Sequence, residues 1–144
     1  MKQKLNLCLP DRPSYLSDFA IKACFYLDLF RYDAEIIIDV KRSLDDECYG
    51  SCVGDRKNVQ IELAVRSFGE LVDKETRLRT CAHELVHAKQ YLTGKLRDVE
   101  KGNGYEVIWG KNKYKWRSNM ALARQPWEAE AYCLENEIYE ACRC

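Results

Sequence analysis

His83-Glu84-Leu85-Val86-His87 is the stretch on which the fold of this chain is built, because the residues around it have the pattern of a long helix. Asp73 is a suitable N-cap, Glu75 suits the first turn and Gly94 is a suitable C-terminal stop. The apolar side of this segment consists of Leu78, Ala82, Leu85, Val86 and Leu92. We therefore expect one helix between Asp73 and Gly94.

Two imidazoles and one carboxylate meet on this predicted helix. At 3.6 residues per turn, His83 and His87 lie on one face, about 40° apart around the axis, and can bind one metal ion. Glu84 projects roughly 100° away, where it can reach a water on that ion without being a ligand. The chain has no other histidines. This arrangement is typical of zinc hydrolases, and it predicts zinc on His83 and His87 with Glu84 as general base.

The third ligand of such a site has to come from elsewhere in the chain. Catalytic zinc usually has three protein ligands and one open position. With both histidines used, the last ligand must be a carboxylate or a thiolate. The best source is a predicted helix that opens at Pro126-Trp127 and continues to about Ala141. Its Glu128 and Glu130 lie about 200° apart, and periodicity does not choose between them.

The remaining segments predict an α+β protein. A helix is expected over residues 14–30 and alternating strands over 36–40 and 59–65, with a short segment at 49–53 and a turn at 54–58. Together these strands predict a small antiparallel sheet with one buried face. Residues 95–104 read as a loop, and residues 105–116 as a short hairpin. The expected order is N-terminal helix, antiparallel sheet, motif helix, hairpin and C-terminal helix.

Composition predicts one globular domain over residues 1–144. Of these residues 47% are hydrophobic and 32% charged, and the net charge is zero. Zero net charge argues against a generally basic nucleic-acid binder or a membrane-surface protein. No run approaches the roughly 20 apolar residues of a membrane-spanning helix. The first ten residues have no apolar stretch of signal-peptide length, so we expect a cytoplasmic protein. The composition does not indicate an oligomeric state.

The eight cysteines are numerous for a chain of this length. Without an export signal, we expect most of them to be free thiols. Three fall within helical patterns and are predicted core residues: Cys24, Cys81 and Cys133. Two further pairs, Cys48-x3-Cys52 and Cys142-Arg143-Cys144, offer ligands for a second, structural zinc site. Neither pair has the usual two-residue spacer, and whether these four form a zinc site, disulfides or neither stays open.

The motif helix and the strand before it resemble the minimal gluzincin peptidases, in which a glutamate from a later helix completes the zinc site. The family pattern Glu-x-x-Ala-Asp/Asn falls here on Glu128-Ala129-Glu130-Ala131-Tyr132 and implies that Glu128 is the third ligand. Tyr132 stands where the family has a residue that supports a zinc-bound histidine, so its hydroxyl would instead face the site. Residues 49–63 and the motif also resemble SprT-like proteases, although the branch with a third histidine is matched only in part.

This resemblance implies a zinc metallopeptidase acting on a protein or peptide. Glu84 would take a proton from water and return it to the leaving amine. A further donor should stabilise the oxyanion, and the candidates are Tyr132, Tyr105 and Arg124. An edge strand near Ser51 or within residues 59–65 would hold an extended substrate by strand addition.

A basic stretch suggests a second partner. Lys111, Lys113, Lys115 and Arg117 alternate with Tyr114 and Trp116, a pattern that suits phosphates and stacked bases. The alternative is an ordinary hairpin with a lysine-rich exposed face. For the whole chain, the second hypothesis is a zinc-stabilised DNA- or protein-binding module with little or no turnover.

Overall fold

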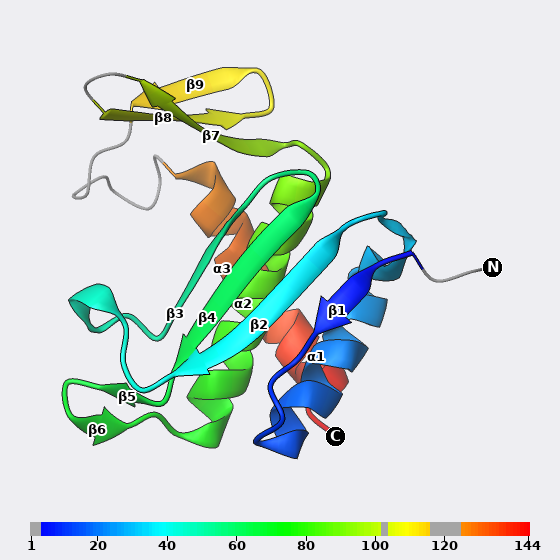
Figure 1. Ribbon diagram of the computed structural model, residues 1–144, viewed down its shortest axis with the longest axis vertical. Helices are drawn as coiled ribbons and strands as arrows, with labels where there is room; N and C mark the ends of the chain where they lie inside the picture. The colour runs from blue at the N-terminus through cyan, green and yellow to red at the C-terminus, as the bar shows by residue number, and fades with distance from the viewer. Residues whose placement is uncertain (1–3, 102–103, 116–124) are drawn as a thin grey trace.

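The computed structural model describes residues 4–101, 104–115 and 125–144 and has an α+β fold. Within these residues, three α-helices accompany three small sheets (Figure 1). The elements in chain order are β1 (Asn6–Cys8), α1 (Ser14–Tyr26), η1 (Leu29–Arg31), β2 (Glu35–Lys41), η2 (Asp45–Glu47), β3 (Gly50–Gly54), β4 (Asn58–Ala64), β5 (Arg66–Ser67), β6 (Glu70–Leu71), α2 (Lys74–Leu92), β7 (Leu96–Lys101), β8 (Gly104–Trp109), β9 (Asn112–Lys115) and α3 (Pro126–Cys142).

The main sheet is mixed, with the strand order β1-β2-β4-β3. The predicted antiparallel sheet is therefore wrong for two pairs, because β1–β2 and β2–β4 are parallel and only β3–β4 is antiparallel. The cause is the connection: α1 crosses over between β1 and β2, as parallel neighbours require. After β2 the chain passes through η2 to the sheet edge, where β3 lies, and β4 then returns between β2 and β3. The three-residue β1 was not predicted, since it is too short to show alternation.

One face of this sheet is buried, as predicted. The side chains of β2 and β4 that point toward the helices are Ile36, Ile38, Val59, Ile61 and Leu63, each at most 2% exposed. On the opposite face polar side chains pair with one another, for example Gln60 with Asp39 at 2.9 Å. Figure 1 shows the three helices together behind the sheet. The inner face of the sheet and the helices enclose one hydrophobic core.

The motif helix, α2, has the boundaries that the sequence predicts. The carboxylate of Asp73 accepts a hydrogen bond from the amide of Thr76 at 2.7 Å, which satisfies one of the free donors at the helix start. Gly94 follows the helix with a φ of 76°, a conformation that glycine adopts without strain. Because α2 packs against the sheet and both other helices, every residue from Cys81 to Ala88 is buried.

Two helical predictions need correction. The helix expected over residues 14–30 ends at Tyr26, because Asp28 takes a left-handed conformation with φ 59° before η1 begins. Cys133 was predicted in the core but is exposed, since it lies outside the buried stripe of α3 formed by Trp127, Ala131, Ile138 and Cys142. Cys24 and Cys81 are buried as predicted, and all eight cysteines are free.

The segment predicted as a loop over residues 95–104 contains β7, so the expected short hairpin is part of a three-stranded antiparallel sheet. Only Leu96 among its first residues is buried, while Arg97 and Asp98 are exposed, which explains why no strand pattern was evident. β8 and β9 form the predicted hairpin, with Gly110 at the turn in a positive-φ conformation. No helix in the described ranges combines the length and apolarity needed to cross a membrane.

Candidate metal centre

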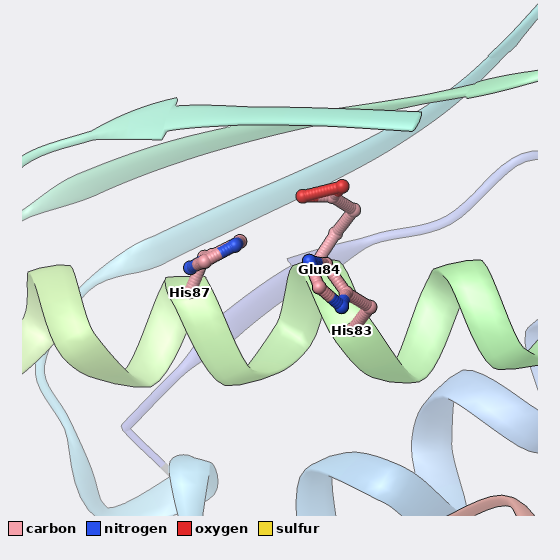
Figure 2. Close-up of side chains that lie close together, drawn as sticks. All are labelled: His83, Glu84 and His87. Atoms are coloured by element: carbon pink, nitrogen blue, oxygen red, sulfur yellow. The ribbon is translucent and has the colours of Figure 1, made fainter. Parts of the chain in front are cut away.

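One turn of α2 brings together the three residues of the motif. The ligand atoms of His83, Glu84 and His87 all lie within 4.8 Å of one another, and all three residues are buried. Figure 2 shows them on the helix, with the carboxylate of Glu84 extended toward the sheet. Such a group could hold a metal ion, as the spacing of the motif predicts.

Helix α3 adds a carboxylate to this group. Oε2 of Glu128 lies 3.3 Å from Nε2 of His83, and its Oε1 contacts Nε2 of His87. Glu130, which periodicity left as an equal candidate, points elsewhere and bonds Gln90 and Lys95. The packing of α3 on α2 therefore directs Glu128, and not Glu130, toward both histidines.

The Nδ1 atom of each imidazole faces a side-chain oxygen that accepts a hydrogen bond. Nδ1 of His83 lies 3.1 Å from Oε1 of Glu135, and Nδ1 of His87 lies 2.7 Å from Oε1 of Gln90. The amide nitrogen of Gln90 donates to the carbonyl of Trp127 at 3.0 Å and to the carboxylate of Glu130 at 3.1 Å, which orients the amide. With a hydrogen on each Nδ1, the Nε2 atoms face Glu128, where each can carry a proton or bind a metal ion.

The electrostatics of the group follow from its carboxylates. Burial disfavours a proton on His83, but Glu128, Glu84 and Glu135 outweigh it and raise the pKa of His83 to about 9. Burial likewise disfavours a proton on His87, but the hydrogen bond to Glu128 and the nearby carboxylates outweigh it and raise the pKa of His87. Burial opposes ionisation of Glu128, yet the two histidines lower its pKa to about 2. The group thus has a strong affinity for positive charge, which a proton or a metal cation can supply.

Glu84 differs from the other carboxylates. It is 6% exposed, and burial raises its pKa despite the opposing effect of both histidines. Glu84 therefore holds a proton more readily than an ordinary glutamate. A general base that must take up and release a proton near neutral pH needs such a shift.

The group opens into a cleft of about 900 Å³ between α2, α3 and the edge strand β3. Gly50 on β3 permits this close approach, because a Cβ there would meet Cγ2 of Thr80 at 2.6 Å and Cγ of Glu84 at 3.2 Å. At the other end of the cleft, the hydroxyl of Tyr91 donates to Asp98 of β7 at 2.7 Å. Glu84 and both histidines line this cleft.

Of the predicted oxyanion donors, Tyr132 lies beside the group. Its ring stands edge-on to His83 with a centroid distance of 4.6 Å, and it lines the cleft with 53% of its surface exposed. Arg124 and the side chain of Tyr105 lie outside the described residues. Tyr132 does not bond the Nδ1 of His83. Glu135, one turn further along α3, does so.

The four cysteines considered for a second zinc site do not form a group that could hold an ion: Cys48, Cys52, Cys142 and Cys144. Cys48 and Cys52 line the cleft, and Cys142 is buried at the end of α3. Among the residues that the structure describes, the only ligand-type group close enough to hold an ion is the one formed by His83, Glu84 and His87.

In the described part of the basic hairpin, Tyr114 lies apart from the exposed lysines. Lys111 and Lys113 are exposed, whereas Tyr114 packs its ring against Trp127 at 5.4 Å. Tyr114 is therefore partly buried against Trp127 of α3, and the predicted contact of the basic stretch with nucleic acid stays a prediction. Trp116, Arg117 and the side chain of Lys115 lie outside the described residues.

Gln90 and Glu135 were not predicted from the sequence. Each carries a spacing signal: Gln90 lies one turn after His87 on α2, and Glu135 lies two turns after Glu128 on α3. That signal is weak by itself, because α3 is rich in glutamates and an acidic helix face is usually solvated. Only the packing of α2 on α3 distinguishes Glu135 from its neighbours.

The described chain is thus an α+β protein with a buried His-Glu-His group that could hold a metal ion. Comparisons of the chain with protein-family models, with curated proteins and with solved structures found no match. The nature of the ion and the chemistry are therefore inferred from the donor atoms and their surroundings.

Proposed function

We propose that this protein is a zinc-dependent metallopeptidase of minimal gluzincin type, with His83, His87 and Glu128 as ligands. The observation that carries the proposal is the contact of Glu128 with Nε2 of both histidines, while Nδ1 of each is occupied by a separate protein acceptor. Two imidazoles and one carboxylate are the ligand set of zinc peptidases. The closed shell behind the imidazoles fits a metal on the Nε2 side.

Glu84 is the proposed general base. When bound, a zinc ion would lower the pKa of a coordinated water toward neutrality and polarise the scissile carbonyl. The carboxylate of Glu84 accepts a proton from the attacking water and delivers it to the departing amine. The Tyr132 hydroxyl, on the exposed side of His83, is the proposed donor to the oxyanion.

The substrate that suits this cleft is an extended peptide. Among the described residues β3 pairs only with β4 and leaves its other edge toward the cleft, so its backbone groups can bond a strand laid beside it. Its inward-facing positions are Gly50, Cys52 and Gly54, which share register with buried residues of β4. Of these positions Gly50 and Cys52 line the cleft, and the missing side chain at Gly50 lets the strand edge lie close to Thr80 and Glu84.

Elemental analysis of purified protein and of four variants tests the metal centre. We expect one zinc per chain in wild type, lost with His83→Ala and Glu128→Ala and retained with Glu130→Ala. Glu84→Gln should keep the zinc and lose turnover in a screen of unfolded protein and peptide substrates. A zinc-free protein that takes up no zinc on addition would contradict the proposal, as would full turnover by Glu84→Gln.

The binding-module alternative has its own signature. Salt-dependent binding of single-stranded DNA that is unaffected by Glu84→Gln, in a protein that holds zinc but cleaves nothing, would favour it. Loss of that binding in a Lys111→Ala/Lys113→Ala variant would assign it to the hairpin.

A further inference from the structure

A second hollow adjoins the cleft. It measures about 270 Å³ and lies beneath the β5–β6 hairpin. Four apolar or aromatic residues and four polar residues line it: Tyr49, Phe68, Leu71 and Val72, with Ser67, Glu70, Asp73 and Thr76. Tyr49 and Thr76 line both this hollow and the main cleft, so the two cavities are neighbours. Figure 1 shows the hairpin at the end of the sheet beside the start of α2.

The rim of this hollow exposes large apolar side chains. Phe68 is 81% exposed, Leu71 is 64% exposed and Tyr49 is 52% exposed. Single exposed apolar residues are ordinary, but three around one hollow form a patch of the kind that binds a partner. We name these three residues the apolar rim.

Phe68 is held in a conformation that its residue type disfavours. Its φ is 50°, in the left-handed region where a bulky side chain is strained. The strain is maintained by Glu47, whose carboxylate accepts the amide of Phe68 at 2.6 Å and whose carbonyl accepts the hydroxyl of Ser67 at 2.6 Å. Glu47 itself has a positive φ of 56°. Phe68 and Gly69, with φ 50° and 78°, are the two central residues of the β5–β6 hairpin, whose two-residue turn requires a positive φ at both positions, and this turn places the Phe68 side chain at the exposed hairpin tip.

We infer that the apolar rim is a subsite for a bulky apolar side chain of the same extended peptide that the cleft accepts. This inference rests on the proposed function, because the position of the peptide is counted from the bond that Glu84 would help to cleave. Thr76 lies about two helical turns, or roughly 10 Å, before His83 along α2. At about 3.3 Å per residue, an extended peptide reaches the rim about three residues from the bond over Glu84. The protein therefore selects peptides with an aromatic or large aliphatic residue at that distance.

Selection from a random peptide library tests this subsite without requiring turnover. Glu84→Gln protein is incubated with zinc and with displayed peptides of about twelve residues, long enough to span both cavities when extended. The same selection uses Phe68→Ala and Phe25→Ala in that background. Phe25 is a matched control, since it is 66% exposed and lies on α1, outside both cavities.

We expect enrichment of large apolar residues at one fixed position, with binding about tenfold weaker in Phe68→Ala, the effect of one large apolar contact. Phe25→Ala should leave binding unchanged. Absence of enrichment, or equal enrichment with Phe68→Ala, would overturn the inference.

Turnover by wild type is measured separately on the selected peptides. If the peptides bind through Phe68 but are not cleaved, the peptidase proposal fails and the subsite stands. If they are cleaved equally by wild type and Phe68→Ala, the peptidase proposal stands and the subsite fails.

Discussion

The two walls of the cleft differ in how their side chains are held. On the helical wall, formed by α2 and α3, His83, His87 and Glu128 are buried or half-buried, and each contacts another member of the group. The strand wall, formed by β3, has an edge that pairs with no other described strand, and the neighbouring hollow has an exposed apolar rim. A preorganised ligand shell suits an ion that requires fixed geometry, and an open edge suits a substrate that must enter and leave.

Among changes to the two walls, Glu84→Gln on the helical wall is expected to have the largest effect on turnover. This change keeps the size of the side chain but removes its ability to take a proton, so turnover should fall about 10²- to 10⁴-fold while zinc is retained. Steady-state rates and metal content are measured on the same preparation. Glu62→Gln, on the outer face of the sheet, is the matched control and should be neutral. Residual activity near wild type would show that the helical wall does not supply the base.

Gln90 tests whether the acceptors behind the histidines matter. Gln90→Met keeps the volume but removes the acceptor of His87 Nδ1, so zinc affinity should fall about 10- to 100-fold. Chelator competition measures the affinity, and ¹⁵N NMR of the imidazoles reports the tautomer of His87. Gln60→Met, on the outer sheet face, controls for loss of a side-chain amide. An unchanged tautomer and affinity would mean that Gln90 only fills space.

The helical wall should also respond to pH. The pKa of His83 is raised from 6.5 to about 9 in the metal-free protein, so its proton contributes stability that is complete below pH 6.5 and lost as pH rises through about 9. Zinc requires the neutral imidazole, so its apparent affinity should rise over that window, by at most about tenfold per unit for one released proton. Competition titrations and thermal unfolding at several pH values measure both trends. A flat zinc affinity from pH 6.5 to 9 would refute this.

The smallest effect is expected from crowding the strand wall. In Gly50→Ala the new Cβ would meet Cγ2 of Thr80 at 2.6 Å, which should destabilise the fold by about 1–3 kcal/mol and reduce kcat/KM by pushing β3 outward. Thr80→Ser removes that methyl group and should rescue most of the loss in the double variant. Urea unfolding and peptide turnover give the two readouts. If Thr80→Ser rescues neither, the contact is not what positions β3.

Local sequence signals were sufficient for the elements that have caps and periodicity. α2 begins after Asp73 and ends before Gly94 as predicted, because capping and left-handed glycine act within a few residues. The turn between β3 and β4 could be predicted for the same reason. Its turn is closed by Asp55, whose carboxylate accepts the amides of Lys57 and Asn58. The motif also predicted correctly that His83, Glu84 and His87 lie together, since one helical turn sets their spacing.

Local sequence signals could not predict the parallel pairing of the main sheet or the polar strand β7. β2 and β4 pair although β3 lies between them in the chain, and strand order depends on contacts that no local window contains. β7 is a strand because β8 pairs with it, in spite of its polar sequence. Propensity is too weak to decide such segments, and the pairing partner decides them.

By itself, the sequence determined the helix that carries the motif and the relative positions of its two imidazoles and one carboxylate. Only the tertiary structure decided that Glu128, and not Glu130, faces them, because helical periodicity places the two glutamates on different faces without saying which face meets α2. The tertiary structure also decided that Gln90 and Glu135 lie behind the histidines and that Phe68 stands beside the cleft. A single helix fixes its own angular spacing, whereas the side that it presents to another helix is set by packing of the whole core.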